Sequence, residues 1–160
     1  MSGNSPENVS KDFEELLAFL SARKVKALVV GGYAFSFHAR PRYTKDIDIW
    51  IDPTPENVER LFQALDDFGF GSLGLKVEDL SEPGQIVQLG FPPNRIDLLT
   101  SIKGLSFEEA WQSRVEDSYG GAPVSYLGMD ELIRNKKAVD RPQDRADVDV
   151  LEFFRGSGNP

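Results

Sequence analysis

The stretch that decides the fold reads LVVGGYAFSFHARPRYTKDIDIWID, from Leu28 to Asp52. It begins inside a β-branched run, residues 24–30, which predicts a buried strand that stops at Gly31-Gly32. Residues 33–39 contain no helix breaker and predict a short helix. Residues 46–51 alternate between polar and apolar side chains at their start and predict a second strand. The segment therefore predicts a strand, a glycine turn, a helix and a strand in succession.

The flanking sequence adds further helices and strands to this unit. Before it, apolar residues recur at helical spacing and predict a helix from Ser10. After it, Thr54-Pro55-Glu56 predicts a helix start, and Gly69 marks the end of that helix. Pro92-Pro93-Asn94 predicts a hairpin-like turn between two short strands. The remaining predicted strands are 85–91, 95–100, 115–119 and 123–127, and the remaining predicted helices are 107–114, 129–139 and 142–154.

This order of elements predicts an α/β (α+β) two-layer fold, with a small mixed sheet and helices mainly on one face. The 160 residues suit one domain, which should bury roughly 70% of the surface of the unfolded chain. We expect a single domain over residues 10–155, with flexible ends at residues 1–9 and 156–160.

Composition excludes several classes of site. The chain has no cysteine and one histidine, so a disulfide scaffold, a zinc finger, a thiol nucleophile and a multi-histidine site are excluded. The net charge of −8 weighs against extended, non-specific binding of nucleic acid. No apolar run reaches the roughly 18 residues of a membrane span, and the first residues lack a signal-peptide pattern. We therefore expect a cytoplasmic protein without membrane contact.

Two acidic pairs of the form Asp-x-Asp lead to different predictions. On a strand, Asp46 and Asp48 share one face about 6–7 Å apart, where they repel each other unless a cation lies between them. Hard divalent cations such as Mg²⁺ prefer such oxygens. Asp147 and Asp149 lie in a predicted helix, where positions i and i+2 diverge by about 200° and cannot converge on one ion. Asp149 is therefore interpreted as part of a solvated acidic face or of a local ion pair, and Asp147 shares a helix face with Asp144.

A third carboxylate, Asp97, interrupts an apolar strand. An acidic residue in such a place needs a reason, because burial of a charge is costly. If its strand lies beside the Asp46 strand, the three carboxylates converge on one face, where they could hold two divalent ions. The alternative is that Asp97 pairs with Arg95 on an exposed face. The lone His38 lies beside aromatic residues and is interpreted as buried or at an edge rather than as a base.

Together these elements resemble the nucleotidyltransferases of the DNA polymerase β superfamily. The shared features are Val30-Gly31-Gly32, thirteen intervening residues, Asp46-Ile47-Asp48 and the later Asp97. The stretch from Arg42 to Asp48 is similar to one branch, the small bacterial nucleotidyltransferases that include abortive-infection toxins. The closing residues 132–147 are similar to the last helices of that branch, so the resemblance covers residues 25–151.

The resemblance implies an enzyme that transfers a nucleoside monophosphate from a nucleoside triphosphate to an acceptor hydroxyl. The acceptor would be RNA such as tRNA, a protein or a small molecule, and a toxin–antitoxin partner protein would be expected of that branch. Mg²⁺, or Mn²⁺ in its place, would be held by carboxylates, which would also be the catalytic residues. By position, these fall on Asp46, Asp48 and Asp97. The nucleotide-binding positions fall on Gly31, Gly32, Arg42, Thr44, Lys45 and Lys136.

One departure and three alternatives accompany this interpretation. Many small members carry an arginine just after the glycine turn, whereas residues 33–37 contain no base here. Phosphate binding would then fall to Arg40, Arg42, Lys45 or a helix lysine. The Gly-Gly turn could be only a tight turn, and the basic residues of the last helices could be a solvated face. A non-catalytic, antitoxin-like binding module on the same fold is the alternative function.

Overall fold

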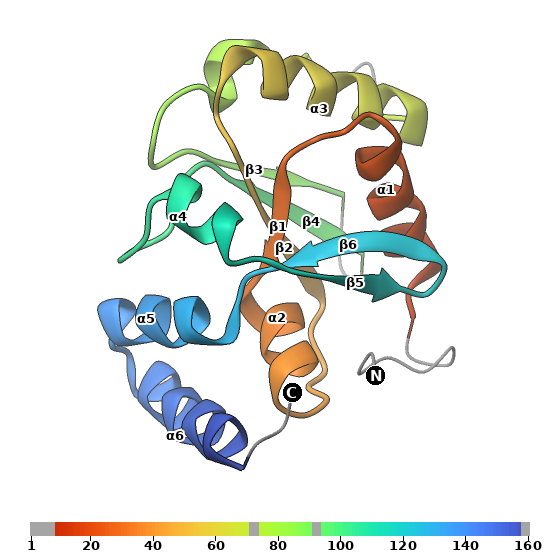
Figure 1. Ribbon diagram of the computed structural model, residues 1–160. Helices are drawn as coiled ribbons and strands as arrows, with labels where there is room; N and C mark the ends of the chain where they lie inside the picture. Colours follow the sequence, from red (N-terminus) through yellow and green to blue (C-terminus); the bar gives the residue numbers. More distant parts are fainter. Residues whose placement is uncertain (1–8, 71–73, 91–93, 158–160) are drawn as a thin grey trace.

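The computed structural model describes residues 9–70, 74–90 and 94–157. The described chain contains a six-stranded sheet and six α-helices (Figure 1). Most of the predicted turn at residues 92–94 and most of both predicted flexible ends lie outside these ranges. In chain order the elements are α1 (Lys11–Ala22), β1 (Ala27–Val30), α2 (Gly31–His38), β2 (Asp46–Ile51), α3 (Pro55–Phe68), the 3₁₀ helix η2 (Val77–Leu80), β3 (Ile86–Leu89), β4 (Arg95–Leu99), α4 (Phe107–Gln112), β5 (Val115–Tyr119), β6 (Ala122–Tyr126), α5 (Met129–Val139) and α6 (Pro142–Gly156).

Local signals explain where the helices begin and end. The Ser10 side chain accepts a hydrogen bond from the backbone of Phe13 and so begins α1. Pro55 occupies the first turn of α3, and Gly69 ends that helix in a left-handed conformation with φ +109°. α6 continues through Gly156, so the predicted tail begins later than residue 156.

The sheet is mixed, with the strand order β3-β4-β2-β1-β6-β5 (Figure 1). β2 is antiparallel to β1 and parallel to β4, and β1 is parallel to β6. In this register Asp48 lies between Val30 of β1 and Asp97 of β4. The predicted small mixed sheet is thus confirmed, and β2 occupies a position near its centre.

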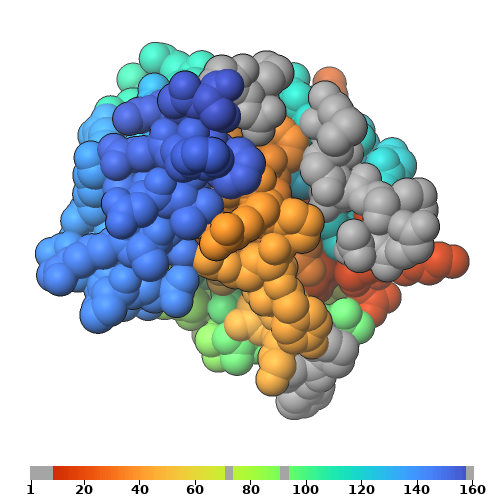
Figure 2. Space-filling model, turned by 90° about the horizontal axis from the view of Figure 1, so that it is seen from below, coloured from red at the N-terminus to blue at the C-terminus, as the bar shows by residue number. Residues whose placement is uncertain are grey.

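One face of the sheet carries a compact group of helices. Leu28 and Val30 of β1 and Trp50 of β2 form a buried cluster with apolar residues of α2, α4, α5 and α6. Seen from below, the blue α5 and α6 lie against the orange α2 and the segment after it (Figure 2). The sequence pattern indicated these helices but not their common packing against α2.

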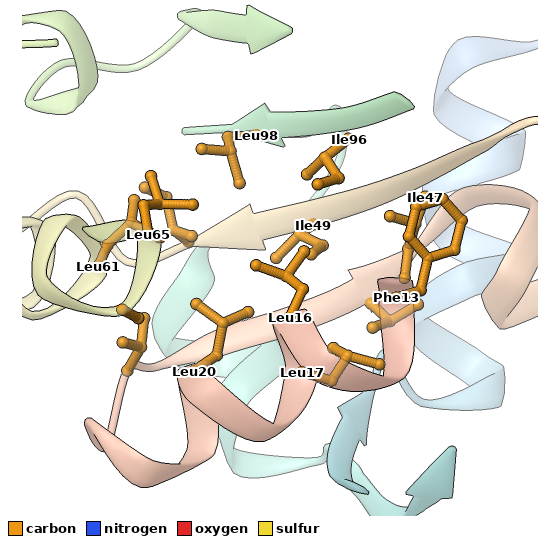
Figure 3. Packing of buried hydrophobic residues seen from close by; sticks show 14 of the residues in the cluster. Phe13, Leu16, Leu17, Leu20, Ile47, Ile49, Leu61, Leu65, Ile96 and Leu98 are labelled. Carbon is orange, nitrogen blue, oxygen red and sulfur yellow. The ribbon is translucent and has the colours of Figure 1, made fainter. Parts of the chain in front are cut away.

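The other face is covered by α1 and α3, which form the larger apolar core. Ile47 and Ile49 of β2 point into this core together with residues of both helices and of β4 (Figure 3). Alternation along the strand therefore sends Asp46 and Asp48 to the opposite face. Burial of each large aliphatic side chain contributes about 1.5–3 kcal/mol, so the register of β2 is strongly specified.

None of the helices in the described ranges is both long enough and apolar enough to cross a membrane.

Candidate active site

Three carboxylates come together where β2 and β4 run side by side. Asp46 and Asp48 share a face of β2, and Asp97 is the register partner of Asp48 on β4. Asp97 is only 8% exposed, whereas Asp46 and Asp48 are half-buried. The structure therefore brings the three predicted metal-binding positions into one cluster, with Asp97 as its innermost member.

Arg95 belongs to the same cluster, although the sequence predicted at most a surface ion pair between Arg95 and Asp97. Its Nη2 lies 2.6 Å from Oδ2 of Asp46 and 3.4 Å from Oδ2 of Asp97, and its Nε lies 3.2 Å from Oδ1 of Asp97. The pairing of Arg95 with Asp97 is thus present, but at a largely buried position and shared with Asp46. The guanidinium compensates part of the negative charge of the carboxylates.

Asp48 carries the most strongly perturbed carboxyl group of the cluster. Burial, together with the neighbouring Asp97 and Asp46, raises its pKa to about 7, and Arg95 opposes this shift. A hydrogen bond between the Asp48 and Asp97 side chains contributes to the same shift. At neutral pH Asp48 therefore exists in both its protonated and its ionised form.

Two oxygens of the cluster lack partners. Oδ1 of Asp46 and Oδ1 of Asp97 are buried and accept no hydrogen bond from any described residue. The Nε atom of Arg95 is close to the second of these oxygens but is not aligned to donate to it. Buried unpartnered carboxylate oxygens are costly unless a cation or donor approaches them.

The donor set suits a hard divalent cation, because its free atoms are carboxylate oxygens. As the side chains stand, no group of three or more Asp, Glu, His or Cys residues in the described ranges forms a metal site. Arg95 lies between Asp46 and Asp97, so its guanidinium contacts the carboxylate oxygens that a divalent metal ion would need. The residues fit such an ion once this arginine shares or releases the two carboxylates.

The glycine turn lies directly against the carboxylates. Gly31 has φ +64°, a conformation that L side chains rarely adopt, and a Cβ atom at this position would overlap Oδ2 of Asp48. At Gly32 an added Cβ would lie 3.4 Å from the side chain of Thr44. The glycines therefore let the start of α2 approach β2 closely. The first backbone N–H groups of this eight-residue helix lie at the same end of the strand pair.

The segment before β2 contributes Thr44 and Lys45. Thr44 donates from Oγ1 to the backbone oxygen of Asp46 at 3.0 Å and so helps to fix the start of the strand. Lys45 is exposed and makes no ion pair with any residue in the described ranges. Its ammonium group is therefore not held by any carboxylate in the described part of the chain.

The structure places the other two predicted phosphate-binding residues differently. Arg42 and Lys136 both pair with Asp147 of α6, and Lys136 is buried. His38 is half-buried with Nε2 2.6 Å from the backbone oxygen of Leu127, and burial lowers its pKa. The ring is therefore mainly neutral at pH 7, and its Nε2 donates to that carbonyl.

Comparisons with known proteins relate this geometry to a fold. No protein-family model matches the chain, and no curated protein matches it. A crystal structure of ANT(2'')-Ia with adenylyl-2''-tobramycin matches with a TM-score of 0.50 and 17% identity, over 91% of this chain and 93% of that one. A lincomycin-bound structure of the lincosamide antibiotic adenylyltransferase LnuA matches with a TM-score of 0.54 and 14% identity, over 91% and 98%.

A solution structure of ANT(2'')-Ia matches with a TM-score of 0.51 and 18% identity, over 91% of this chain and 88% of that one. These matches extend over most of each chain. The sequence therefore encodes a nucleotidyltransferase fold like that of ANT(2'')-Ia and LnuA.

Proposed function

We propose that the protein is a nucleotidyltransferase that transfers a nucleoside monophosphate from a nucleoside triphosphate to an acceptor hydroxyl. The observation that carries the proposal is the packing of Gly31 against Asp48, with Asp97 beside it on β4. A close approach of a helix N-terminus to buried carboxylates joins a place for phosphate to a place for a cation. The fold shared with the adenylyltransferases supports the same activity.

In this proposal Asp46, Asp48 and Asp97 hold Mg²⁺, with Mn²⁺ as a substitute. When bound, the ion neutralises charge on the triphosphate and fixes the orientation of its phosphates. The backbone of Gly31 and Gly32 at the start of α2 accommodates the phosphates. Their negative charge is favoured there by the free N–H groups and the helix dipole.

The reaction assigns distinct roles to the chain's own side chains. The acceptor oxygen attacks the α-phosphorus, the bond from that phosphorus to the pyrophosphate oxygen breaks, and pyrophosphate leaves. The proton of the acceptor hydroxyl passes to Oδ1 of Asp97, which is buried and accepts no hydrogen bond from the described residues. Lys45, which is exposed beside β2, stabilises the charge of the departing pyrophosphate.

We propose ATP as the donor and a small hydroxyl compound as the acceptor. One matched protein, LnuA, is described as an adenylyltransferase and is bound to lincomycin, and another, ANT(2'')-Ia, is in complex with adenylyl-2''-tobramycin. The net charge of −8 also favours a neutral or cationic small acceptor over a polyanion. An RNA acceptor such as tRNA, a protein acceptor and a toxin–antitoxin partner are the competing assignments from the sequence.

The test uses purified protein with each α-³²P-labelled nucleoside triphosphate and Mg²⁺, with three acceptor pools kept apart. The pools are a set of aminoglycosides and lincosamides, total RNA, and a protein extract freed of small molecules. Transfer of label to a small compound from ATP, and from no other nucleoside triphosphate, would support ATP as the donor and a small compound as the acceptor. Label on RNA or protein would overturn the proposed small-molecule acceptor but would support nucleotidyl transfer. No label in any pool, together with a stoichiometric protein complex, would favour the non-catalytic module.

A further inference from the structure

We propose that Asp147 of α6 is a positioning residue of the site, which fastens the segment leading into Asp46 to the closing helices. This inference rests on the proposed function. It also gives Arg42 and Lys136 a different role from direct phosphate binding. Both residues would act on the reaction through the position of residues 42–46.

Asp147 is the centre of a buried ionic network. It is 1% exposed and accepts from Arg42 Nη1 at 3.0 Å and Nη2 at 2.5 Å, from Lys136 Nζ at 2.9 Å, and from Gln143 Nε2 at 2.9 Å. Each of its two oxygens therefore accepts two hydrogen bonds. Such a carboxylate is fully satisfied, and the bidentate contact fixes the orientation of the Arg42 guanidinium.

The ionised state of the network is secured by its cations. Burial alone would raise the pKa of Asp147, but Arg42 and Lys136 bring it down to about 2. Lys136 also lies 3.6 Å from Asp144, which Arg141 pairs at 2.7 Å. The positive charges of Arg42 and Lys136 are thus matched by buried carboxylates of α6, which leaves little free charge for a phosphate.

The segment before β2 is held from three directions. The Arg42 guanidinium stacks 3.8 Å from the centroid of the Phe35 ring of α2, and the Arg42 N–H donates to Ser36 Oγ at 3.1 Å. Asp147 of α6 binds the Arg42 side chain, and the Thr44 hydroxyl donates to the Asp46 backbone oxygen at the start of β2. Figure 2 shows α5 and α6 against α2 and this segment.

Removal of one contact in such an arrangement should move the start of β2. Thr44 touches the Gly32 position, and Asp46 belongs to the carboxylate cluster, so both substrate-facing parts lie within four residues of Arg42. A displacement of about 1 Å in a catalytic constellation can cost about 10²-fold in rate. The expected defect lies in kcat, because the phosphate-binding backbone of α2 remains in place.

The experiment compares Asp147→Asn with Asp149→Asn, the same chemical change two residues along the same helix at an exposed position. Asp147→Asn should lower kcat roughly 10- to 100-fold, with KM for the nucleoside triphosphate changed less than threefold. Hydrogen exchange of residues 42–46 should be faster in this variant. Asp149→Asn should match the wild type in all three measurements.

Three results would overturn the proposal. They are an unchanged kcat, a raised KM at unchanged kcat, and exchange at residues 42–46 equal to that of the wild type. If the wild type has no transfer activity, the proposed function fails, and the exchange measurement alone then decides the positioning role.

If Asp147→Asn does not fold, Arg42→Lys and Arg42→Ala replace it. The positioning role predicts that lysine restores part of the kcat lost with alanine and slows exchange of the segment. Equal exchange in these two variants would overturn it.

Discussion

Replacement of Asp48 by asparagine should make the metal-free protein more stable at alkaline pH, although it removes a proposed catalytic group. The pKa of Asp48 is raised from 3.8 to about 7 in the folded chain. The folded state therefore binds the proton more tightly than the unfolded state does. The contribution of Asp48 to the free energy of unfolding therefore falls as pH rises from 3.8 to about 7, and it is lowest above pH 7. Asparagine keeps the shape of the side chain and never acquires the charge.

The size of the effect follows from the pKa. Between pH 5 and the pKa of about 7, two pH units at about 1.36 kcal/mol each set a limit of about 2.7 kcal/mol. Asp48 is partly accessible to water, so we expect about 2 kcal/mol. In a domain of this size that is about 4–8 °C in Tm. The gain of Asp48→Asn over wild type should therefore be larger at pH 8 than at pH 5 by that amount.

Thermal unfolding in buffer with EDTA measures this difference at both pH values. Asp149→Asn, on an exposed face of α6, serves as the control and should follow the wild type at both. A gain for Asp48→Asn that is the same at pH 5 and pH 8 would rule this explanation out, because the pKa of Asp48 would then not be raised in the folded protein. A loss of stability at pH 8 would refute it as well.

Two further predictions concern the cation and the glycine turn. Mg²⁺ at ten times its Kd should stabilise the wild type by about 1.4 kcal/mol, seen as a rise of a few degrees in Tm. Asp48→Asn should lose that rise, and an equal rise in both proteins would place the ion elsewhere. Gly31→Ala should disrupt the carboxylate site. It should also lower the free energy of unfolding by more than the roughly 1–2 kcal/mol that an alanine in a left-handed conformation costs, because its Cβ would overlap Asp48. Gly69→Ala, with no atom near its Cβ, should show only the backbone cost, and equal losses would contradict the close packing.

Much of the fold was predictable because its signals are local. The alternation in β2 fixes both the strand and the face on which Asp46 and Asp48 lie. Serine, proline and glycine at the ends of α1 and α3 fix where these helices begin and end. The short helix η2 was missed, since four residues carry no measurable period. The packing of α5 and α6 on α2 depends on contacts between distant segments, which no local pattern encodes.

The site divides in the same way. The divergence of positions i and i+2 on a helix predicted that Asp149 is solvated, and the structure leaves it exposed. Asp147 was placed on the face of Asp144, and both are buried. Its pairing with Arg42 joins residues 105 positions apart, which spacing cannot reveal. The share of Arg95 in the carboxylate cluster likewise required the register of β2 with β4.

Pyrophosphate release is the most direct test of nucleotidyl transfer at the cluster of Asp46, Asp48 and Asp97. The purified protein is incubated with ATP, Mg²⁺ and the acceptor pool that becomes labelled, and pyrophosphate is measured against transferred label. We expect the wild type and Asp149→Asn each to release one pyrophosphate for every label transferred. Asp48→Asn should release none while it unfolds at or above the wild-type temperature. Equal release by Asp48→Asn and Asp149→Asn, or no release by the wild type with any pool, would contradict the account.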